Sequence, residues 1–415
     1  MARLYPPNAN SGGDTILLTN PSTKTFASWA AWTKWAMLIC SAGLIAVLLN
    51  KMSPQNEPWT FAVSVPETPV LGALDTRSEV ITPPDAKQFV HGASVIATPD
   101  GLFATWYRAT YEGAYDAELV SSRFDGSQWS PEAVVTNSAR VSHDFGITIK
   151  SLANPVSFRR SENEIWLFFA ASKLSGWATC EIGLVRSFDN GRTWGPAERL
   201  QASPFLNMSH LTKSVPILFS DGRIGLPAYH EMNRKYPVLL VLDENGRVVD
   251  RRRMGDGGKV GYQPSIVPTG PTTAIAFVRR LKSRHPQSIL ITRTADGGKT
   301  WTTPSPIDLP NPGGPISAIR YDASHILLAF NDDPKIERNI TLALTDLDGK
   351  TFQRVGVVAQ MDNGNQSSAV TYPYLIESAP GQFDIVYSQP LKTINHVRFS
   401  SAWVQHGSQS RTAQQ

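Results

Sequence analysis

The chain has 415 residues, a formal net charge of +4, a pI near 9.0 and only two cysteines. So small a net charge argues against a nucleic-acid binder, and the run Arg251–Arg253 fits a solvated strand end better than a basic patch. Two cysteines exclude a disulfide-rich framework, and the eight histidines are scattered. We therefore expect no metal ion, no cofactor and no nucleic-acid partner.

The N-terminal region contains a candidate membrane span. Residues 1–26 are polar and predict a disordered tail. Residues 27–50 include an uncharged run from Trp35 to Leu49, and with Lys34 as the one intruding charge they reach the roughly 20 residues that a span requires. We therefore predict a transmembrane anchor at 27–50.

A cleaved signal peptide is the alternative for this segment. It fits less well, because the preceding region is long and no A-x-A cleavage site follows the apolar run. The basic residues Arg3, Lys24 and Lys34 slightly favour a cytoplasmic N-terminus, which would place the rest of this single-pass protein on the extracytoplasmic side. Residues 51–85 are rich in proline and predict a linker.

From residue 86 onward, short β-rich runs alternate with turn signals. Runs such as ASVIAT, EIGLVRSF and SILITRT each end in a Pro-Asp-Gly, Asp-Asn-Gly or Asp-Gly-Gly turn. Strands punctuated in this way, with no amphipathic helix between them, predict an antiparallel all-β domain. We assign this domain to residues 86–405 and a second disordered tail to residues 406–415.

A short pattern, [ST]-x-D-x-G-x-T-W, recurs within the β-rich region. Two full copies begin at Ser187 and Thr294, and two degenerate copies begin at Ser122 and Thr345. If the longest interval holds two units, the repeat is about 50–65 residues long, and six units fill the domain. Radial repetition of four-stranded sheets at this period predicts a six-bladed β-propeller.

The repeated pattern also has a local structural interpretation. Each copy lies between two strands, so its aspartate and glycine are expected to form the hairpin turn, and its tryptophan is expected to pack between neighbouring hairpins. We therefore interpret Asp189 and Asp296 as turn residues and not as catalytic carboxylates.

These motifs resemble the Asp boxes, or bacterial neuraminidase repeats, of the sialidase superfamily. The resemblance covers residues 88–404 and includes HGASVIATPDGLFATWYRATYEGAYDAE, SVPILFSDGRIGLPAYHE, GYQPSIV, AIAFVRR, RNITLAL and TYPYL. It implies a sialidase-like six-bladed propeller acting on glycans.

The resemblance also implies functional residues. Sialidases hold the substrate carboxylate with three arginines, attack with a tyrosine, and use an aspartate as acid/base. By position, Arg279 (or the arginine after it) and Arg338 match the second and third arginines. Tyr372 matches the nucleophile, and Asp116 matches the acid/base, with Glu112 as a competitor.

Two positions depart from the sialidase pattern. His91 stands where the first arginine is expected, and Gln263 stands where a glutamate normally activates the tyrosine. An amide cannot accept a proton from Tyr372, so Glu231 is a candidate substitute base, and Lys213 is a candidate for the missing cation.

Two classes of function follow from these observations. The first is a membrane-anchored glycoside hydrolase of exo-sialidase type with a modified active site, acting on an acidic, sialic-acid-like glycan. The second is a propeller that does not hydrolyse: a lectin-like carbohydrate-binding protein, or a lyase of an acidic polysaccharide that uses Tyr372 as its base.

Overall fold

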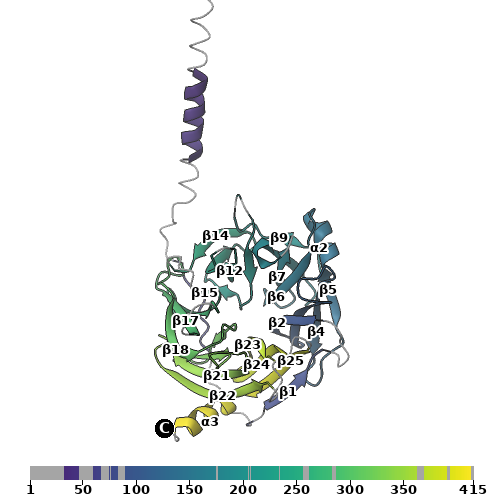
Figure 1. Cartoon of the computed structure of the whole chain (residues 1–415), viewed down its shortest axis with the longest axis vertical. Coiled ribbons are helices and arrows are strands. Elements are labelled where there is room, and N and C mark those ends of the chain that lie inside the picture. Colours follow the sequence, from purple (N-terminus) through teal and green to yellow (C-terminus); the bar gives the residue numbers. More distant parts are fainter. Residues whose placement is uncertain are drawn as a thin grey trace, which may run out of the picture. The chain divides into compact units, whose positions relative to one another are not determined.

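The computed structural model describes residues 32–45, 59–66, 74, 76–82, 89–173, 176–203, 205, 207–232, 234–255, 261–282, 287–361, 369–389 and 393–412. The chain divides into two compact units, Met1–Glu57 and Pro58–Gln415. Within the second unit the described residues form six antiparallel sheets arranged as a ring (Figure 1). The predicted all-β, six-bladed propeller is therefore confirmed.

The first three blades follow one another along the chain, each with its innermost strand first. The first blade contains β2 (Phe89–Thr98), β3 (Gly101–Ala109), β4 (Glu118–Phe124) and β5 (Ala133–Asn137). The second contains β6 (Ser151–Arg159), β7 (Ile165–Ser172), β8 (Cys180–Ser187) and β9 (Glu198–Arg199). The third contains β10 (His210–Thr212), β11 (Ile217–Leu218), β12 (Ile224–His230), β13 (Tyr236–Leu242) and β14 (Val248–Arg253).

The remaining blades complete the ring. The fourth contains β15 (Gly261–Pro268), β16 (Ala274–Arg280), β17 (Ser288–Thr294) and β18 (Ser305–Pro310). The fifth contains β19 (Ser317–Arg320), β20 (His325–Phe330), β21 (Asn339–Asp346) and β22 (Phe352–Gln360). The sixth contains β23 (Thr371–Ala379), β24 (Gln382–Gln389), β25 (Thr393–Ser400) and, as its outermost strand, β1 (Thr76–Val80). The described residues of the second unit also form three short helices, α2 (Ser138–Phe145), η1 (Trp177–Thr179) and α3 (Ser401–Thr412).

The ring is closed by strands from opposite ends of the domain. Strand β1 pairs antiparallel with β25, with Thr76 opposite Phe399 and Val80 opposite Asn395. Upstream of β1, Trp59 and Phe61 are buried in a cluster with residues of the third and fourth blades. The prediction that all of residues 51–85 form a linker is therefore wrong for these segments, because they contribute a strand and apolar packing to the propeller.

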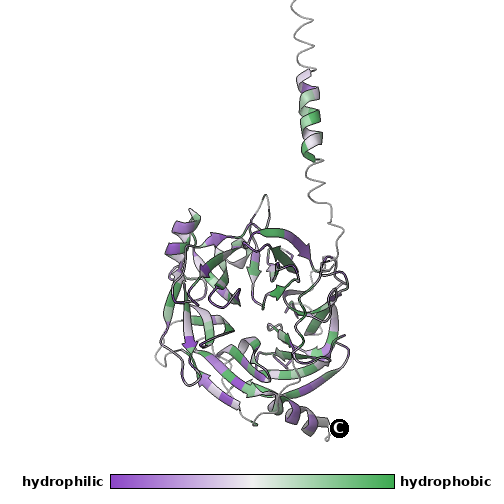
Figure 2. Cartoon of the chain, turned by 180° about the vertical axis from the view of Figure 1, so that it is seen from behind, coloured by the Kyte–Doolittle hydropathy of each residue, from purple (hydrophilic) through white to green (hydrophobic). Residues whose placement is uncertain are grey.

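Neighbouring blades pack through apolar side chains on both faces of each sheet. All eight residues of β7 are buried, as expected for a strand covered on both sides. Gly183 on β8 lies beneath the ring of Phe169, where a Cβ atom would stand 2.3 Å from Cζ. Only glycine fits there without displacing the ring. Figure 2 shows apolar residues concentrated in the strands of the ring, whereas α3 is mostly hydrophilic.

The repeated turns have the predicted structure. Asp189 accepts hydrogen bonds from the hydroxyls of Ser187 (2.7 Å) and Thr193 (2.6 Å). Trp301 in the second full copy is buried, and Trp194 in the first is half-buried, with its ring 6.0 Å from that of Phe103. These hydrogen bonds consume the acceptor capacity of Asp189, so it acts as a turn residue.

The fourth copy of the repeat uses a different aspartate. Here the sequence has Leu347 at the position of the turn aspartate, and Asp346 one residue earlier accepts from the hydroxyl of Thr351 at 2.5 Å and from its amide at 2.8 Å. The turn therefore keeps an aspartate that accepts hydrogen bonds from the threonine of the motif, although this aspartate stands one residue earlier.

The two terminal segments differ in what the structure describes. Residues 32–45 are helical, and in the described part of the chain no helix is long and apolar enough to cross a membrane. The predicted span of 27–50 is therefore not supported, and its two ends, like residues 1–26, lie outside the described residues. At the C-terminus α3 extends to Thr412, with Val404 buried. The predicted disordered tail from 406 is wrong over this helix, because its inner face packs against β22.

Candidate active site

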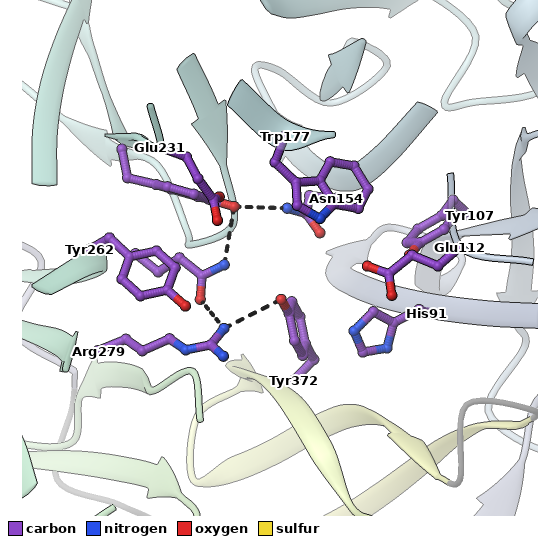
Figure 3. A pocket seen from close by; sticks show the side chains of 11 residues that line it. His91, Tyr107, Glu112, Asn154, Trp177, Glu231, Tyr262, Arg279 and Tyr372 are labelled. Carbon is purple, nitrogen blue, oxygen red and sulfur yellow. Dashed lines mark hydrogen bonds between the residues drawn. The ribbon is translucent and has the colours of Figure 1, made fainter. Parts of the chain in front are cut away.

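A cavity of about 200 Å³ lies at one rim of the ring, where the inner strands begin and the second strands end (Figure 3). Its lining comes from five of the six blades and is composed almost entirely of aromatic and polar side chains: His91, Tyr107, Glu112, Asn154, Trp177, Tyr229, Glu231, Tyr262, Gln263, Arg279 and Tyr372. The Asp-box-like turns follow the third strands, which run antiparallel to the second strands. They therefore lie at the opposite rim.

The inner strands of four blades are interrupted at the level of this cavity. Gly92, Asn154, Gln263 and Tyr372 have left-handed backbones, with φ of 66°, 48°, 51° and 59°. The strand pairing slips by a residue or more at each of them. A non-glycine residue in this region costs about 1–3 kcal/mol, and such strain is concentrated at functional sites.

Proline follows three of these positions, namely Asn154, Gln263 and Tyr372. Proline has no N–H to offer the neighbouring strand, so the ladder is broken where the bulge occurs. Each break turns one side chain out of the normal alternation, and all three of these side chains line the cavity.

Tyr372 is held from several sides. Its hydroxyl lies 3.4 Å from Nη1 of Arg279, which donates to it. Its ring lies 4.1 Å from that of His91, in an edge-on arrangement. The ammonium group of Lys213 lies 5.5 Å from the ring centroid and donates to the carbonyl of Pro373 at 3.3 Å. A guanidinium beside the phenol oxygen stabilises negative charge on that oxygen.

A chain of hydrogen bonds runs from Arg279 across the cavity wall. Arg279 Nη1 donates to Oε1 of Gln263 at 2.8 Å, and Gln263 Nε2 donates to the hydroxyl of Tyr229 at 3.1 Å. Asn154 Nδ2 also donates to this hydroxyl at 3.1 Å. The amide of Gln263 thus orients Arg279 through its oxygen and Tyr229 through its nitrogen.

Arg279 keeps one end free for a ligand. Its Nε donates to the carbonyl of Gly313, whereas Nη2 donates to none of the residues that the structure describes. Its guanidinium also lies 4.9 Å from the ring centroid of Tyr262. A buried guanidinium with a free N–H group is suited to binding a carboxylate or a sugar hydroxyl.

Two carboxylates line the cavity from different blades. Burial, and then the charge of Glu231, raise the pKa of Glu112. Glu231 forms an ion pair with Lys235, and its backbone N–H donates to the hydroxyl of Ser209 at 3.0 Å. Figure 3 shows the two carboxyl groups on separate sides of the cavity. The two carboxyl groups therefore differ in their surroundings, since the pKa of Glu112 is raised and Glu231 is paired with a lysine.

His91 and Lys213 are less able to act as cations than the sequence suggests. Burial, and then the charges of Lys213 and Arg279, lower the pKa of His91 to about 3, so its imidazole is neutral. Nδ1 of His91 lies 3.0 Å from the hydroxyl oxygen of Ser388. Burial and the charge of Arg279 lower the pKa of Lys213 to about 7, and Lys213 lies behind Tyr372, outside the cavity lining.

The structure brings five of the eight predicted site residues together and leaves three outside. The lining includes His91, Glu231, Gln263, Arg279 and Tyr372. Asp116 is exposed and accepts hydrogen bonds from the backbone N–H and the hydroxyl of Thr110. The side chain of Arg338 is about half exposed, and its Nε lies 3.5 Å from the carboxylate of Asp333. Neither of these two lines the cavity, and Lys213 lies behind it.

Sequence reasoning missed most of the aromatic lining, namely Tyr107, Trp177, Tyr229 and Tyr262, and weighed Glu112 only as a competitor of Asp116. The Asn154-Pro155 pair did carry a usable signal. It is one of three X-Pro pairs on inner strands in which the residue before proline has a left-handed backbone, and in each of these three that residue lines the cavity.

Comparisons with known proteins agree with this fold. The model of the BNR repeat-like domain family matches residues 100–385. A protein of unknown function from Dyadobacter fermentans is 17% identical, with a TM-score of 0.64 over 78% of this chain and 99% of that one. A comparison with curated proteins gives no significant match.

Sialidases are also among the similar structures. The intramolecular trans-sialidase of Ruminococcus gnavus is 14% identical, with a TM-score of 0.61 over 79% of this chain and 98% of that one. The Trypanosoma rangeli sialidase is 14% identical with the same TM-score, over 79% of this chain. This chain spans 57% of that protein's length. At these identities the likeness shows a shared fold.

Proposed function

Because the chain belongs to the BNR repeat-like domain family and carries the cavity described above, we propose that it is a glycoside hydrolase of sialidase type with a modified active site. One observation carries this proposal: the hydroxyl of Tyr372 lies beside Arg279 in a cavity that is also lined by a carboxyl group with a raised pKa, that of Glu112. A nucleophile and a proton donor in one enclosed site are the two groups that a retaining glycosidase needs.

Each side chain then has a defined role. Glu112, whose raised pKa favours the protonated form, donates its proton to the glycosidic oxygen as the bond to the leaving group breaks. Tyr372 attacks the anomeric carbon, and its proton passes to Glu231, the second carboxylate of the cavity. Water then attacks the anomeric carbon: Glu112 takes a proton from the water, the bond to Tyr372 breaks, and Glu231 returns its proton to the tyrosine oxygen.

The charges of the site favour an acidic sugar. Arg279 offers Nη2 to a carboxylate, and the similar structures include sialidases. Only one guanidinium lines the described cavity, since His91 is neutral and Arg338 lies outside. We therefore expect weaker binding of a sialic acid carboxylate than a clamp of three arginines would give.

The test compares wild-type protein and Tyr372→Phe on fluorogenic and natural sialosides. Tyr372→Phe should lose most of its turnover and bind substrate nearly as well, because it lacks the nucleophile and keeps the ring. Equal turnover of the two proteins would rule out the tyrosine mechanism.

A lyase is the second candidate, and one observation favours it. Gln263 stands where sialidases carry the glutamate that activates the tyrosine. The hydroxyl of Tyr372 instead accepts a hydrogen bond from Arg279. A tyrosine oxygen beside a guanidinium is suited to act as the base that removes a proton from a uronic acid. An unsaturated product absorbing in the ultraviolet, formed from a uronic-acid polysaccharide, would identify this activity, and release of a free saturated sugar would identify the hydrolase.

A membrane location for the protein is a further proposal, and it is supported only by the sequence. The uncharged run from Trp35 to Leu49 and the nearby tryptophans suit a single span, with the propeller on the extracytoplasmic side. Full-length protein should then remain in the membrane pellet after a carbonate wash. A soluble form beginning near residue 51 would indicate a cleaved signal instead.

A further inference from the structure

A second cavity adjoins the first. It has a volume of about 260 Å³, and Glu112 and Trp177 line both cavities. The carboxyl group that we assign as the proton donor therefore lies at the boundary between the two spaces. A glycosidic bond placed at Glu112 would have one sugar in the first cavity and the next sugar in the second.

The second cavity contains polar groups without partners. Among the described residues, no carboxylate pairs with the ammonium group of Lys150, which lies 5.4 Å from the ring centroid of Tyr115. The hydroxyl of Ser151 is buried and has no hydrogen-bond partner in the part of the chain that the structure describes. A buried hydroxyl left unpaired is destabilising, and a ligand hydroxyl would supply the missing hydrogen bond.

Aromatic rings border the same cavity. Tyr111, on the loop after β3, is 59% exposed, and Trp177 forms the start of η1. Exposed rings beside a few convergent polar groups are the usual composition of a small-molecule site. Sugars match such a site, because they present apolar C–H faces together with hydroxyl groups.

We propose that the second cavity binds the leaving-group sugar of the substrate, and that this sugar carries a carboxylate which pairs with Lys150. The preferred substrate is then a glycan with two successive acidic sugars. The position of the scissile bond rests on the proposed function, whereas the binding of the second acidic sugar does not require that the bond be cleaved.

Two compounds with the same terminal sugar test this proposal. Disialic acid and 3′-sialyllactose both end in sialic acid, but the second sugar is acidic in the first compound and neutral in the second. Full-length wild-type protein should bind disialic acid about three- to tenfold more tightly, the effect of one partly desolvated charge pair. Binding is measured by calorimetry, and hydrolysis of each compound is followed in parallel.

Matched variants identify the cation responsible. Lys150→Gln should lose the preference for disialic acid, and Lys150→Arg should retain it because the charge is kept. Lys350→Gln is the control, since Lys350 is a surface lysine paired with Asp348 in a turn at the opposite rim. Its preference should equal that of wild type. Melting temperatures show whether each variant is folded.

The outcomes separate this proposal from the proposed function. Preferential binding that depends on Lys150 but leads to no cleavage would refute the hydrolase and support the second subsite. Cleavage of both compounds with equal affinity, or an unchanged preference in Lys150→Gln, would overturn the subsite and leave the hydrolase standing. Binding of neither compound would overturn the subsite.

Discussion

Replacing Glu112 with glutamine tests which acidic residue donates the proton. Glu112 lines the cavity and has a raised pKa, whereas Asp116, four residues later, lies outside the cavity lining and is bound by Thr110. General acid catalysis contributes about 10²–10⁴-fold to rate, or about 3–5 kcal/mol of barrier. Glu112→Gln should therefore slow hydrolysis of a natural glycoside by this factor.

The leaving group provides an internal check on this magnitude. An activated aryl glycoside departs without protonation, so its release should be slowed far less by Glu112→Gln than that of a natural disaccharide. The assay is the ratio of kcat/KM for the two substrates in wild-type and variant protein. Asp116→Asn is the matched control and should change this ratio by less than about threefold, because it removes only a loop hydrogen bond.

The pH dependence gives a second readout. Partial burial, and then the charge of Glu231, raise the pKa of Glu112, so its carboxyl group stays protonated to a higher pH than an ordinary glutamate. An acid is active in its protonated form, and activity should fall as the pH rises through this pKa. Glu112→Gln should remove that alkaline limb. A large loss in Asp116→Asn together with wild-type behaviour of Glu112→Gln would refute this assignment.

Three further predictions concern the packing, the buried lysine and the modified activation. Trp301→Ala should lower the free energy of unfolding by about 3–5 kcal/mol in a denaturant titration, because the buried ring would leave a cavity, and a loss below about 1 kcal/mol would contradict its packing role. The pKa of Lys213 is lowered to about 7 in the folded state, so the unfolded state binds more protons above this pH and stability should rise with pH up to the ordinary lysine value of 10.5. Lys213→Met should abolish this rise, measured as unfolding free energies at pH 6 and pH 9, and an identical pH dependence in both proteins would count against the burial effect. Gln263→Glu places a carboxylate 2.8 Å from Arg279 and near Tyr372, and should increase sialoside hydrolysis at least about tenfold if activation of the tyrosine is what the native site lacks. Unchanged or lower hydrolysis would show that Glu231 already supplies the base or that the mechanism differs.

The sequence by itself was sufficient to determine the architecture of the propeller. Runs of β-branched and aromatic residues predict its strands, and Asp-Gly and Asn-Gly turns separate these runs. The repeated turn motif carries its own chemistry, since the hydrogen bonds of Asp189 are all made within the motif. Local interactions of this kind are encoded within a few residues, so the repeat spacing was enough to count six blades.

The limits of the ring were decided only by the tertiary structure. Strand β1 pairs with β25, which lies more than 300 residues later in the sequence. The residues of segment 76–80 do not indicate which strand they pair with. Trp59 and Phe61 likewise lie in a Pro-rich stretch whose composition indicates a linker, and they are buried only because the third and fourth blades leave an apolar surface for them.

The composition of the active site was also decided by the tertiary structure. Glu112 and Asp116 lie on one loop, and the bonds from Thr110 hold Asp116 outside the cavity while Glu112 lines it. The bulge at Tyr372 sets the direction of its side chain through strand register, which a linear pattern does not specify. The neutral state of His91 depends on burial beside Lys213 and Arg279, so its charge is a property of the assembled ring and not of the residue type.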